Sequence, residues 1–496
     1  MNFATLTFLL FLPLVFSLYW LIRGRTSQNV LLIVASYLFY GWWDWRFCSL
    51  MLISSLIDYL VGRMIHGSSV KRTRRFWLGF SLLTNLGMLG FFKYFNFFAD
   101  SFVSLAGLVG WELSDVTLRI VLPVGISFYT FQTLSYTLDI YFGKMRPTRS
   151  LIDFMAFVSF FPQLVAGPIE RAPDLLPQFQ NPRKFDYELA KDGLRQMLWG
   201  FWKKLIVADR LSEVVDPIYG SSFANAGLQT ATGPQIMLAT FAFAFQIYCD
   251  FSAYSDIAIG TARLFGFQLR RNFAYPFFAQ TVGEFWRRWH ISLSTWFRDY
   301  LFQPLGGVRG TRVLVIRNVM ITFVIAGLWH GASWNFIFWG TIMGIGFLPE
   351  PLAIFDRRKR KVRAPMEEPG GPDLIPKPRV FIRMVVTFSI FCCSGIFFRS
   401  PDMQSAAMAI QRMLADLFNP HAYATIFQGA DPNSIRSAPI VIAILLAIEW
   451  VQRRHDHVLT LKGWARPWRW VLYTVLVWSI LVAMPGDTKG FVYFQF

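Results

Sequence analysis

Apolar stretches long enough to cross a lipid bilayer recur along this chain from residue 3 to residue 485. A spanning helix needs about 20 mainly apolar residues to cross roughly 30 Å of hydrocarbon. Such stretches fall at 3–22, 30–43, 47–65, 77–98, 118–142, 313–329, 334–348, 380–398, 439–450 and 470–484. We therefore expect an all-α polytopic membrane protein with about 10–12 transmembrane helices, forming a single domain over residues 1–496.

The charge of the chain lies where a membrane protein places it. Charged residues make up 16% of the sequence, against about 25% in soluble domains. Lys and Arg exceed Asp and Glu by 48 − 30 = +18, and this excess gathers in short loops at 63–75, 144–149, 357–363 and 453–469. The positive-inside rule places these loops in the cytoplasm and both termini outside. The position of the basic residues, in short loops beside apolar segments, therefore indicates a membrane protein and no nucleic-acid partner.

Two further segments have a distinct composition. Residues 356–379 are rich in Pro, Gly and charge, which predicts a flexible cytoplasmic loop within the membrane domain. Residues 403–417 are amphipathic and are expected to form a helix along the outer membrane surface.

The middle third of the chain is less regular than the rest. Its apolar runs at 152–165, 197–207 and 236–267 are interrupted by polar, proline and charged residues. Broken or re-entrant segments are tolerated at membrane depth only where they are buried in protein or line a cavity. We therefore expect broken helices here rather than simple spans, and the functional site among them.

Two of the six histidines lie where a histidine is costly. His290 follows GEFWRRW, and His330 falls in IAGLWHGASW between two strongly apolar runs. An ionisable residue at membrane depth points to function, with a structural hydrogen-bonding role as the alternative for His330 and helix packing or headgroup contact for His290. The other four occupy loops or polar flanks: His66, His421, His455 and His457.

Imidazole suits acyl transfer, because a neutral ring takes a proton from an attacking hydroxyl and later returns one. The sequence contains no GxSxG elbow, P-loop or HExxH motif, so serine-hydrolase, nucleotide-hydrolysis and zinc-peptidase chemistry lack support. The four cysteines show no CxxC spacing and are interpreted as structural, and no metal site is expected.

The two histidine segments resemble a known family. GEFWRRWHISLSTWFRDY and LWHGASWNFIFWG are similar to the paired signature of the membrane-bound O-acyltransferases (MBOAT), in the bacterial branch with the alginate O-acetylation and teichoic-acid D-alanyl transfer proteins. VLPVGISFYTFQTLSYTLDIYFG, FVSFFPQLVAGPIER, QIYCDFSAYSDIAIG and the terminal FVYFQF support the resemblance, which covers nearly the whole chain.

The resemblance implies a fold, a reaction and partners. Helices would surround a thin central region pierced by a tunnel, with His330 catalytic and His290 at the second motif position. No cofactor would be bound. Acetyl coenzyme A would be the cytoplasmic acyl donor, an exported polysaccharide such as alginate the acceptor, and periplasmic acetyltransferases the protein partners. The protein would lie in the bacterial inner membrane.

Three other readings stay open. D-alanyl transfer to teichoic acid and O-acetylation of peptidoglycan are alternatives within the enzyme class. A transporter without group transfer is the alternative from another class, because broken segments and intramembrane polar residues also suit transport.

Charged residues near the motifs are weaker candidates for substrate binding. Arg287, Arg288 and Arg298 are expected either to hold the phosphates of coenzyme A or to anchor a helix at the headgroups. Asp250 and Asp256, six residues apart, are interpreted as substrate contacts or as structural groups that pair with Arg263 or with broken backbone.

The remaining candidates are aromatic or lie in the GPIER motif. Trp329 and Trp334 are candidate substrate contacts, although they and Trp339 also suit packing and interface anchoring. Glu170 and Arg171 are expected to form a buried ion pair that fixes a loop.

Overall fold

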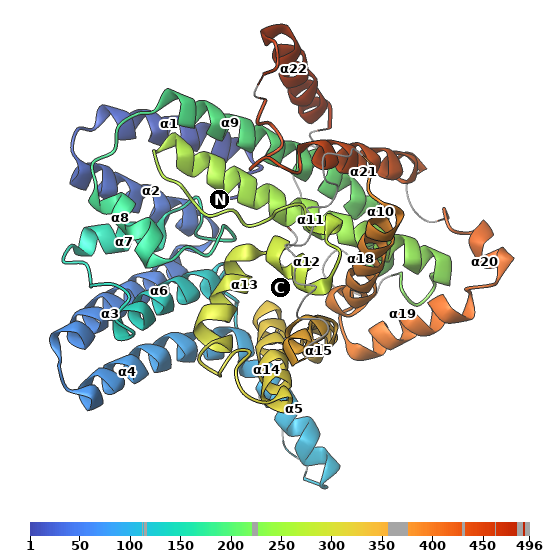
Figure 1. Cartoon of the computed structure of the whole chain (residues 1–496), viewed down its shortest axis with the longest axis horizontal. Helices are drawn as coiled ribbons and strands as arrows, with labels where there is room; N and C mark the ends of the chain where they lie inside the picture. The colour runs from blue at the N-terminus through green and yellow to red at the C-terminus, as the bar shows by residue number, and fades with distance from the viewer. Residues whose placement is uncertain are drawn as a thin grey trace. The chain divides into compact units, whose positions relative to one another are not determined.

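The computed structural model describes residues 1–111, 113, 117–220, 227–355, 375–428, 432–461, 463–483 and 490–491, and the regular structure in these ranges is helical throughout (Figure 1). The chain divides into two compact units, residues 1–194 with 257–270, and residues 195–256 with 271–496. The all-α prediction is confirmed. The single domain stays a prediction, and most of the predicted loop at 356–379 lies outside the described residues.

The first unit is built mainly from helices of the N-terminal part of the chain. They are α1 (Leu6–Leu21), α2 (Arg25–Asp44), η1 (Trp45–Phe47), α3 (Cys48–Gly67), α4 (Lys71–Leu89), η2 (Gly90–Tyr94), α5 (Phe95–Leu108), α6 (Ile126–Tyr141), α7 (Leu151–Ser159), α8 (Ala172–Gln180) and the start of α9 (Tyr187–Trp202). Helices α3, α4 and α6 pack against one another, as Figure 1 shows.

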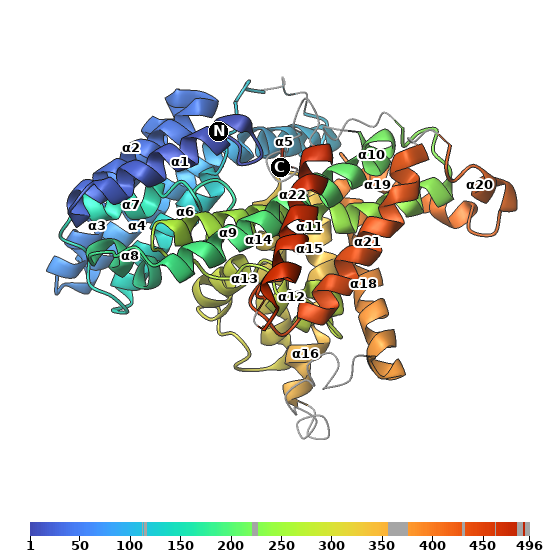
Figure 2. The same cartoon turned by 90° about the horizontal axis from the view of Figure 1, so that it is seen from above.

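The second unit carries both motif histidines. It contains η3 (Lys203–Ala208), α10 (Asp209–Tyr219), most of α11 (Gly233–Leu264), η4 (Pro276–Phe278), α12 (Val282–Arg288), α13 (Ile291–Phe297), η5 (Arg298–Phe302), α14 (Arg312–His330), α15 (Trp334–Phe347), α16 (Pro349–Leu352), η6 (Ala353–Phe355), α18 (Pro378–Arg399), α19 (Met403–Ala415), α20 (Pro420–Ala424), α21 (Pro432–Gln452) and α22 (Arg466–Ala483). Helix α10 packs against α21, and α18 packs against α15 (Figures 1 and 2). The amphipathic helix predicted at 403–417 is present as α19.

Six helical segments among the described residues are long and apolar enough to cross a membrane: Arg25–Gly67, Gly233–Leu264, Arg312–His330, Trp334–Phe355, Pro378–Arg399 and Ser434–Gln452. Shorter apolar helices such as α1 accompany them. The predicted stretch at 118–142 begins later than expected, because α6 starts at Ile126 after a turn in which Gly125 has a φ of 78°. Only glycine adopts that conformation without cost.

The expectation of broken helices in the middle third is right in part and wrong for α11. Helix α7 ends at Ser159 and turns follow, and a π-helical segment, η3, interrupts the path from α9 to α10. Helix α11, in contrast, runs unbroken over 32 residues. Its polar side chains do not break it because they find partners on neighbouring segments, such as Thr240 with Tyr219 at 2.7 Å.

A buried polar cluster joins the three packed helices of the first unit. Asp58 on α3 accepts hydrogen bonds from Ser81 at 2.5 Å and from the Asn85 amide at 2.8 Å, both on α4. The Asn85 oxygen in turn accepts from Ser54 at 2.8 Å and from Thr133 on α6 at 3.4 Å. Since Asp58 and Asn85 have no exposed surface, these bonds hold the helices in one register.

We expect Asp58→Ala to destabilise the first unit by about 1–3 kcal/mol, because two buried donors lose their acceptor. The measurement is the temperature at which the purified protein loses its monodisperse peak on size-exclusion chromatography after heating in detergent. Asp58→Asn keeps an acceptor oxygen, so its melting temperature should lie between those of Asp58→Ala and the wild type. Equal melting of Asp58→Ala and the wild type would contradict a stabilising role for the cluster.

Candidate functional site

The structure brings the two motif histidines together. His330 is the last residue of α14 and His290 precedes α13, and their ring centroids are 6.4 Å apart. His290 has no exposed surface and His330 is 5% exposed. Their separation and burial place both histidines in one buried site.

A strained turn presents His290. Its φ of 43° and ψ of 53° lie in the left-handed region. Among the described non-glycine residues, only Tyr275 also has a positive φ. Such backbone costs about 1–3 kcal/mol and is characteristic of functional sites. The turn separates α12, which ends at Arg288, from α13, whose first backbone bond runs from Ser294 to the His290 carbonyl at 2.9 Å.

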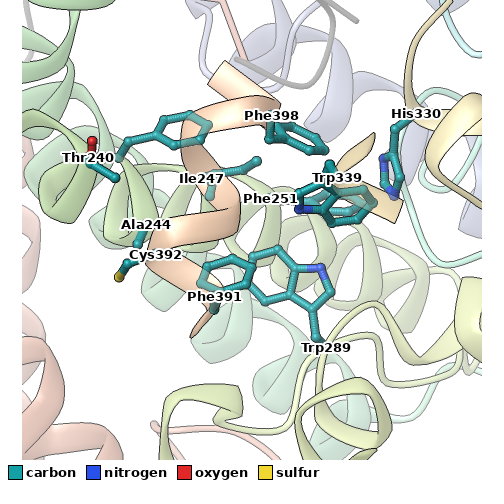
Figure 3. Close-up of a pocket in the computed structure, with 12 residues that line it drawn as sticks. Thr240, Ala244, Ile247, Phe251, Trp289, His330, Trp339, Phe391, Cys392 and Phe398 are labelled. Carbon is teal, nitrogen blue, oxygen red and sulfur yellow. The ribbon is translucent and has the colours of Figure 1, made fainter. Parts of the chain in front are cut away.

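Aromatic rings surround both imidazoles. Trp329, Trp339 and Phe398 lie with ring centroids 5.0, 5.2 and 5.5 Å from that of His330. Phe251 on α11 meets the His290 ring edge-on at 4.7 Å. Figure 3 shows the rings of Phe398 and Trp339 beside His330. The imidazoles therefore lie in an apolar environment from which bulk water is excluded.

A small cavity lies directly beside His330 (Figure 3). Its volume is about 20 Å³, and it is lined by Thr240, Phe243, Ala244, Ile247, Phe251, Trp289, His330, Trp339, Phe391, Cys392, Gly395 and Phe398. A cavity of that size holds about one group the size of a water molecule or a methyl. Apart from His330, the lining is almost entirely apolar.

The environment keeps His290 neutral. Burial, and secondarily the neighbouring His330, lower the pKa of His290 well below its usual value. His290 lies outside the six candidate spans, in the turn between two short helices. A neutral imidazole has one nitrogen with a free lone pair to accept a proton, which is the form needed for general-base chemistry.

The three candidate arginines each contact a carboxylate. Arg287 pairs with Glu350, Arg288 with Glu284 at 2.7 Å, and Arg298 with its neighbour Asp299 at 2.7 Å. The side chains of Arg287 and Arg298 are 50% and 57% exposed. Exposed guanidinium groups of this kind suit both alternatives, phosphate binding and headgroup anchoring, so the choice stays open.

Asp250 and Asp256 meet lysines, not Arg263. Lys204 contacts Asp250 at 2.8 Å and Asp209 at 2.9 Å, and Lys203 contacts Asp256 at 2.7 Å. Arg263 pairs with Asp192 in the first unit. The expected partner was wrong because the sequence analysis passed over the two lysines on η3, although consecutive lysines inside GFWKKLIVA are a signal in an apolar run.

The two candidate tryptophans have different positions. Trp329 is 3% exposed and lies near both imidazoles, with its centroid 6.0 Å from that of His290. Trp334 opens α15 and is 57% exposed, away from the cavity lining. Trp339, one turn further along α15, lines the cavity instead. Packing periodicity along a helix begun at Trp334 would have favoured Trp339.

Glu170 in the first unit has a different contact from the expected one. Its carboxylate accepts the backbone N–H of Arg270 at 2.5 Å, and the Arg270 guanidinium pairs with Asp174. Burial raises the pKa of Glu170 to about 8. The carboxyl group therefore ties the GPIER loop to the segment after α11 through a backbone bond.

Sequence reasoning missed one residue of the site completely. Asn272, in the loop after α11, lies with its side-chain oxygen 3.1 Å from His290 Nδ1 and has no exposed surface. Nothing in the pattern of the loop QLRRNFAYP distinguishes this asparagine from a surface residue. Among the described residues there is no group of three or more His, Cys, Asp or Glu side chains arranged to hold a metal.

We expect Lys204→Met to destabilise the protein by about 3–5 kcal/mol, because it removes the cation that two buried carboxylates contact. Thermal unfolding in detergent measures this. Lys191→Met is the matched control, since Lys191 pairs with Glu188 at the surface and should change stability by less than about 1 kcal/mol. Similar losses in the two variants would refute the importance of the buried network.

Comparison with known proteins gives independent evidence on the family of this chain. Residues 145–393 match the membrane-bound O-acyltransferase family. A protein of Azotobacter vinelandii named as a probable alginate O-acetylase, AlgI, is 36% identical over 464 residues, covering 93% of this chain and 87% of that protein. The Pseudomonas aeruginosa protein of the same name is 38% identical over 417 residues, covering 84% and 75%. A Helicobacter pylori peptidoglycan O-acetyltransferase is 32% identical over 437 residues, covering 82% and 78%. The matched region contains His290 and His330.

Proposed function

Because the chain belongs to the membrane-bound O-acyltransferase family, we propose that it takes an acetyl group from acetyl coenzyme A and transfers it, at His330, toward a hydroxyl of an exported polysaccharide. The small apolar cavity beside His330 carries this proposal. Its volume of about 20 Å³ and its apolar lining suit the methyl group of an acetyl.

The chemistry requires one proton to move and one acyl bond to be exchanged. The acceptor oxygen attacks the thioester carbonyl, a C–O bond forms, and the C–S bond breaks to release the thiol of coenzyme A. Neutral His330 takes the hydroxyl proton and delivers it to the leaving sulfur. In an alternative mechanism, His330 itself accepts the acetyl group transiently from the thioester and passes it on to the acceptor oxygen. Both versions need the dry, aromatic surroundings that the site provides.

The cavity favours acetyl over D-alanyl transfer. A D-alanyl group carries an ammonium next to its carbonyl, and an ammonium taken out of water is costly unless a counter-charge meets it. Among the described residues that line the cavity, none has a carboxylate. The methyl group of an acetyl, in contrast, gains from apolar surroundings.

The acceptor and partners follow from the relatives. The names of two relatives point to alginate and that of a third to peptidoglycan. We propose an exopolysaccharide such as alginate, with peptidoglycan as the second candidate. The protein would lie in the bacterial inner membrane with both termini outside. Because the sequence predicts only short outer segments, we propose that periplasmic acetyltransferases receive the acetyl group.

We expect His330→Ala to lower thiol release from acetyl coenzyme A by at least about 10²-fold, because the group that moves the proton is lost. Release is measured with a thiol reagent on protein in vesicles. His421→Ala is the matched control, since His421 is exposed on α20 and should leave turnover unchanged.

Turnover that survives in a folded His330→Ala protein would refute the catalytic assignment. Absence of turnover in the wild type, with acetyl coenzyme A and membrane extracts supplied, would refute the proposal that acetyl coenzyme A is the acyl donor.

We expect Gly395→Ala to lower the rate with propionyl coenzyme A about 10-fold or more relative to acetyl coenzyme A, because the added methyl narrows the cavity by about one carbon. Gly395 lines the cavity, and a Cβ there would meet only a Phe243 ring carbon at 3.8 Å, an ordinary contact. The stability of the protein should not fall, because alanine has a higher helix propensity than glycine.

The control for this variant is Gly87→Ala on α4, where an added Cβ meets nothing within 4 Å. Its ratio of propionyl to acetyl turnover should equal that of the wild type. An unchanged ratio in Gly395→Ala would show that the cavity does not hold the acyl group.

A further inference from the structure

Asn272 contacts His290 and both sides of its turn. The side-chain oxygen lies 3.1 Å from His290 Nδ1, accepts the Ser292 hydroxyl at 2.9 Å, and accepts the Ser292 backbone N–H at 3.3 Å. The Asn272 amide nitrogen donates to Ser255 on α11 at 3.1 Å, and its backbone carbonyl accepts from Ile291 at 2.9 Å. One fully buried side chain thus joins the loop, the His290 turn and α11.

These contacts fix which end of the Asn272 amide faces the histidine. The two ends of an amide are nearly isosteric, so their assignment has to come from the hydrogen-bond network. A backbone N–H is an obligate donor, and the Ser292 N–H points at the atom that also faces His290. That atom is therefore the carbonyl oxygen. The amide nitrogen then faces the Ser255 hydroxyl, which accepts.

The tautomer of His290 follows from the same contact. A carbonyl oxygen has no proton to give, so a neutral imidazole facing it bonds only through a protonated Nδ1. We propose that Asn272 is a positioning residue that holds His290 in the Nδ1-protonated tautomer, so that Nε2 is its basic nitrogen, and that its bonds to Ser292 keep the left-handed turn in place.

The consequence for acyl transfer rests on the proposed function. His290 and His330 have ring centroids 6.4 Å apart, so the nitrogen that His290 presents as a base determines where it takes or returns a proton in the site. Without the hydrogen bond to Asn272, the His290 ring exchanges between its two tautomers, and its basic nitrogen no longer has a fixed position. Loss of the partner that orients a catalytic histidine in serine proteases costs about 10⁴-fold.

The direct experiment is nitrogen-15 NMR of the full-length protein in nanodiscs with labelled histidine, using His290→Gln to assign the His290 signals. We expect the shift pattern of an Nδ1-protonated neutral ring in the wild type. Asn272→Asp keeps an acceptor and should keep that pattern, whereas Asn272→Ala should give mixed tautomers. An Nε2-protonated ring in the wild type, or an unchanged pattern in Asn272→Ala, would overturn the proposal.

Activity provides a second readout that a purely structural role would not change. Asn272→Asp places a carboxylate against His290, which raises its pKa, so the acidic limb of the pH–rate profile should move to higher pH. His330 is the titratable neighbour that acts on His290 in the wild type, and it is unchanged in this variant. Ser255→Ala, which loses only the partner of the amide nitrogen, should leave the profile in place.

The two readouts separate the two claims. The expected NMR pattern without acetyl transfer would refute the proposed function and leave the tautomer assignment standing. Acetyl transfer with the opposite tautomer would refute the role of Asn272 alone. If Asn272→Ala does not fold, the wild-type pattern and the shift in Asn272→Asp still decide, because an unmoved profile in a folded Asn272→Asp protein contradicts the contact.

Discussion

The need to pair every polar group inside an apolar protein interior governs this structure. A buried polar or charged group without a partner costs several kcal/mol, and at membrane depth no water is available to help. The chain nevertheless buries lysines, aspartates, asparagines and histidines, and the described contacts show polar partners for many of them. Lys204 lies between two carboxylates, and Asn85 links three helices by its side chain alone.

The same constraint explains why the site forms at helix ends. His330 ends α14 and His290 precedes α13, where the backbone leaves the helical path and a side chain reaches neighbours that a helix interior keeps out of range. The left-handed backbone at His290 is unfavourable on its own. It persists because Asn272 receives hydrogen bonds from the residues that follow the turn.

Much of the fold and the central pair of the site could be predicted from the sequence. Long apolar runs and loop charge predict the all-α membrane class, and the GEFWRRWH and LWHGASW segments identify the family and both histidines. The family prediction is confirmed by the comparisons. The continuity of α11 was not predicted, because apolar runs do not reveal that Asp250 and Asp256 meet lysines brought by another segment.

Asn272 shows why the rest was out of reach. It lies eighteen residues before His290 in a loop of ordinary composition, and only the fold returns it to the histidine. Trp334 stays a candidate substrate contact, and the fold brings Trp339 from the same helix to the cavity beside His330. Long-range contacts depend on tertiary packing, which neither periodicity nor spacing encodes.

Helix α11 links these features in the second unit. Within six residues it sends Asp250 to Lys204, Phe251 to the His290 ring, and Ser255 to Asn272. An unbroken helix fixes the rotation between these side chains, so the buried ion pairs and the histidine turn share one rigid support. The two lysines therefore do more than neutralise Asp209, Asp250 and Asp256. They hold against η3 the same helix that contacts the His290 ring and Asn272.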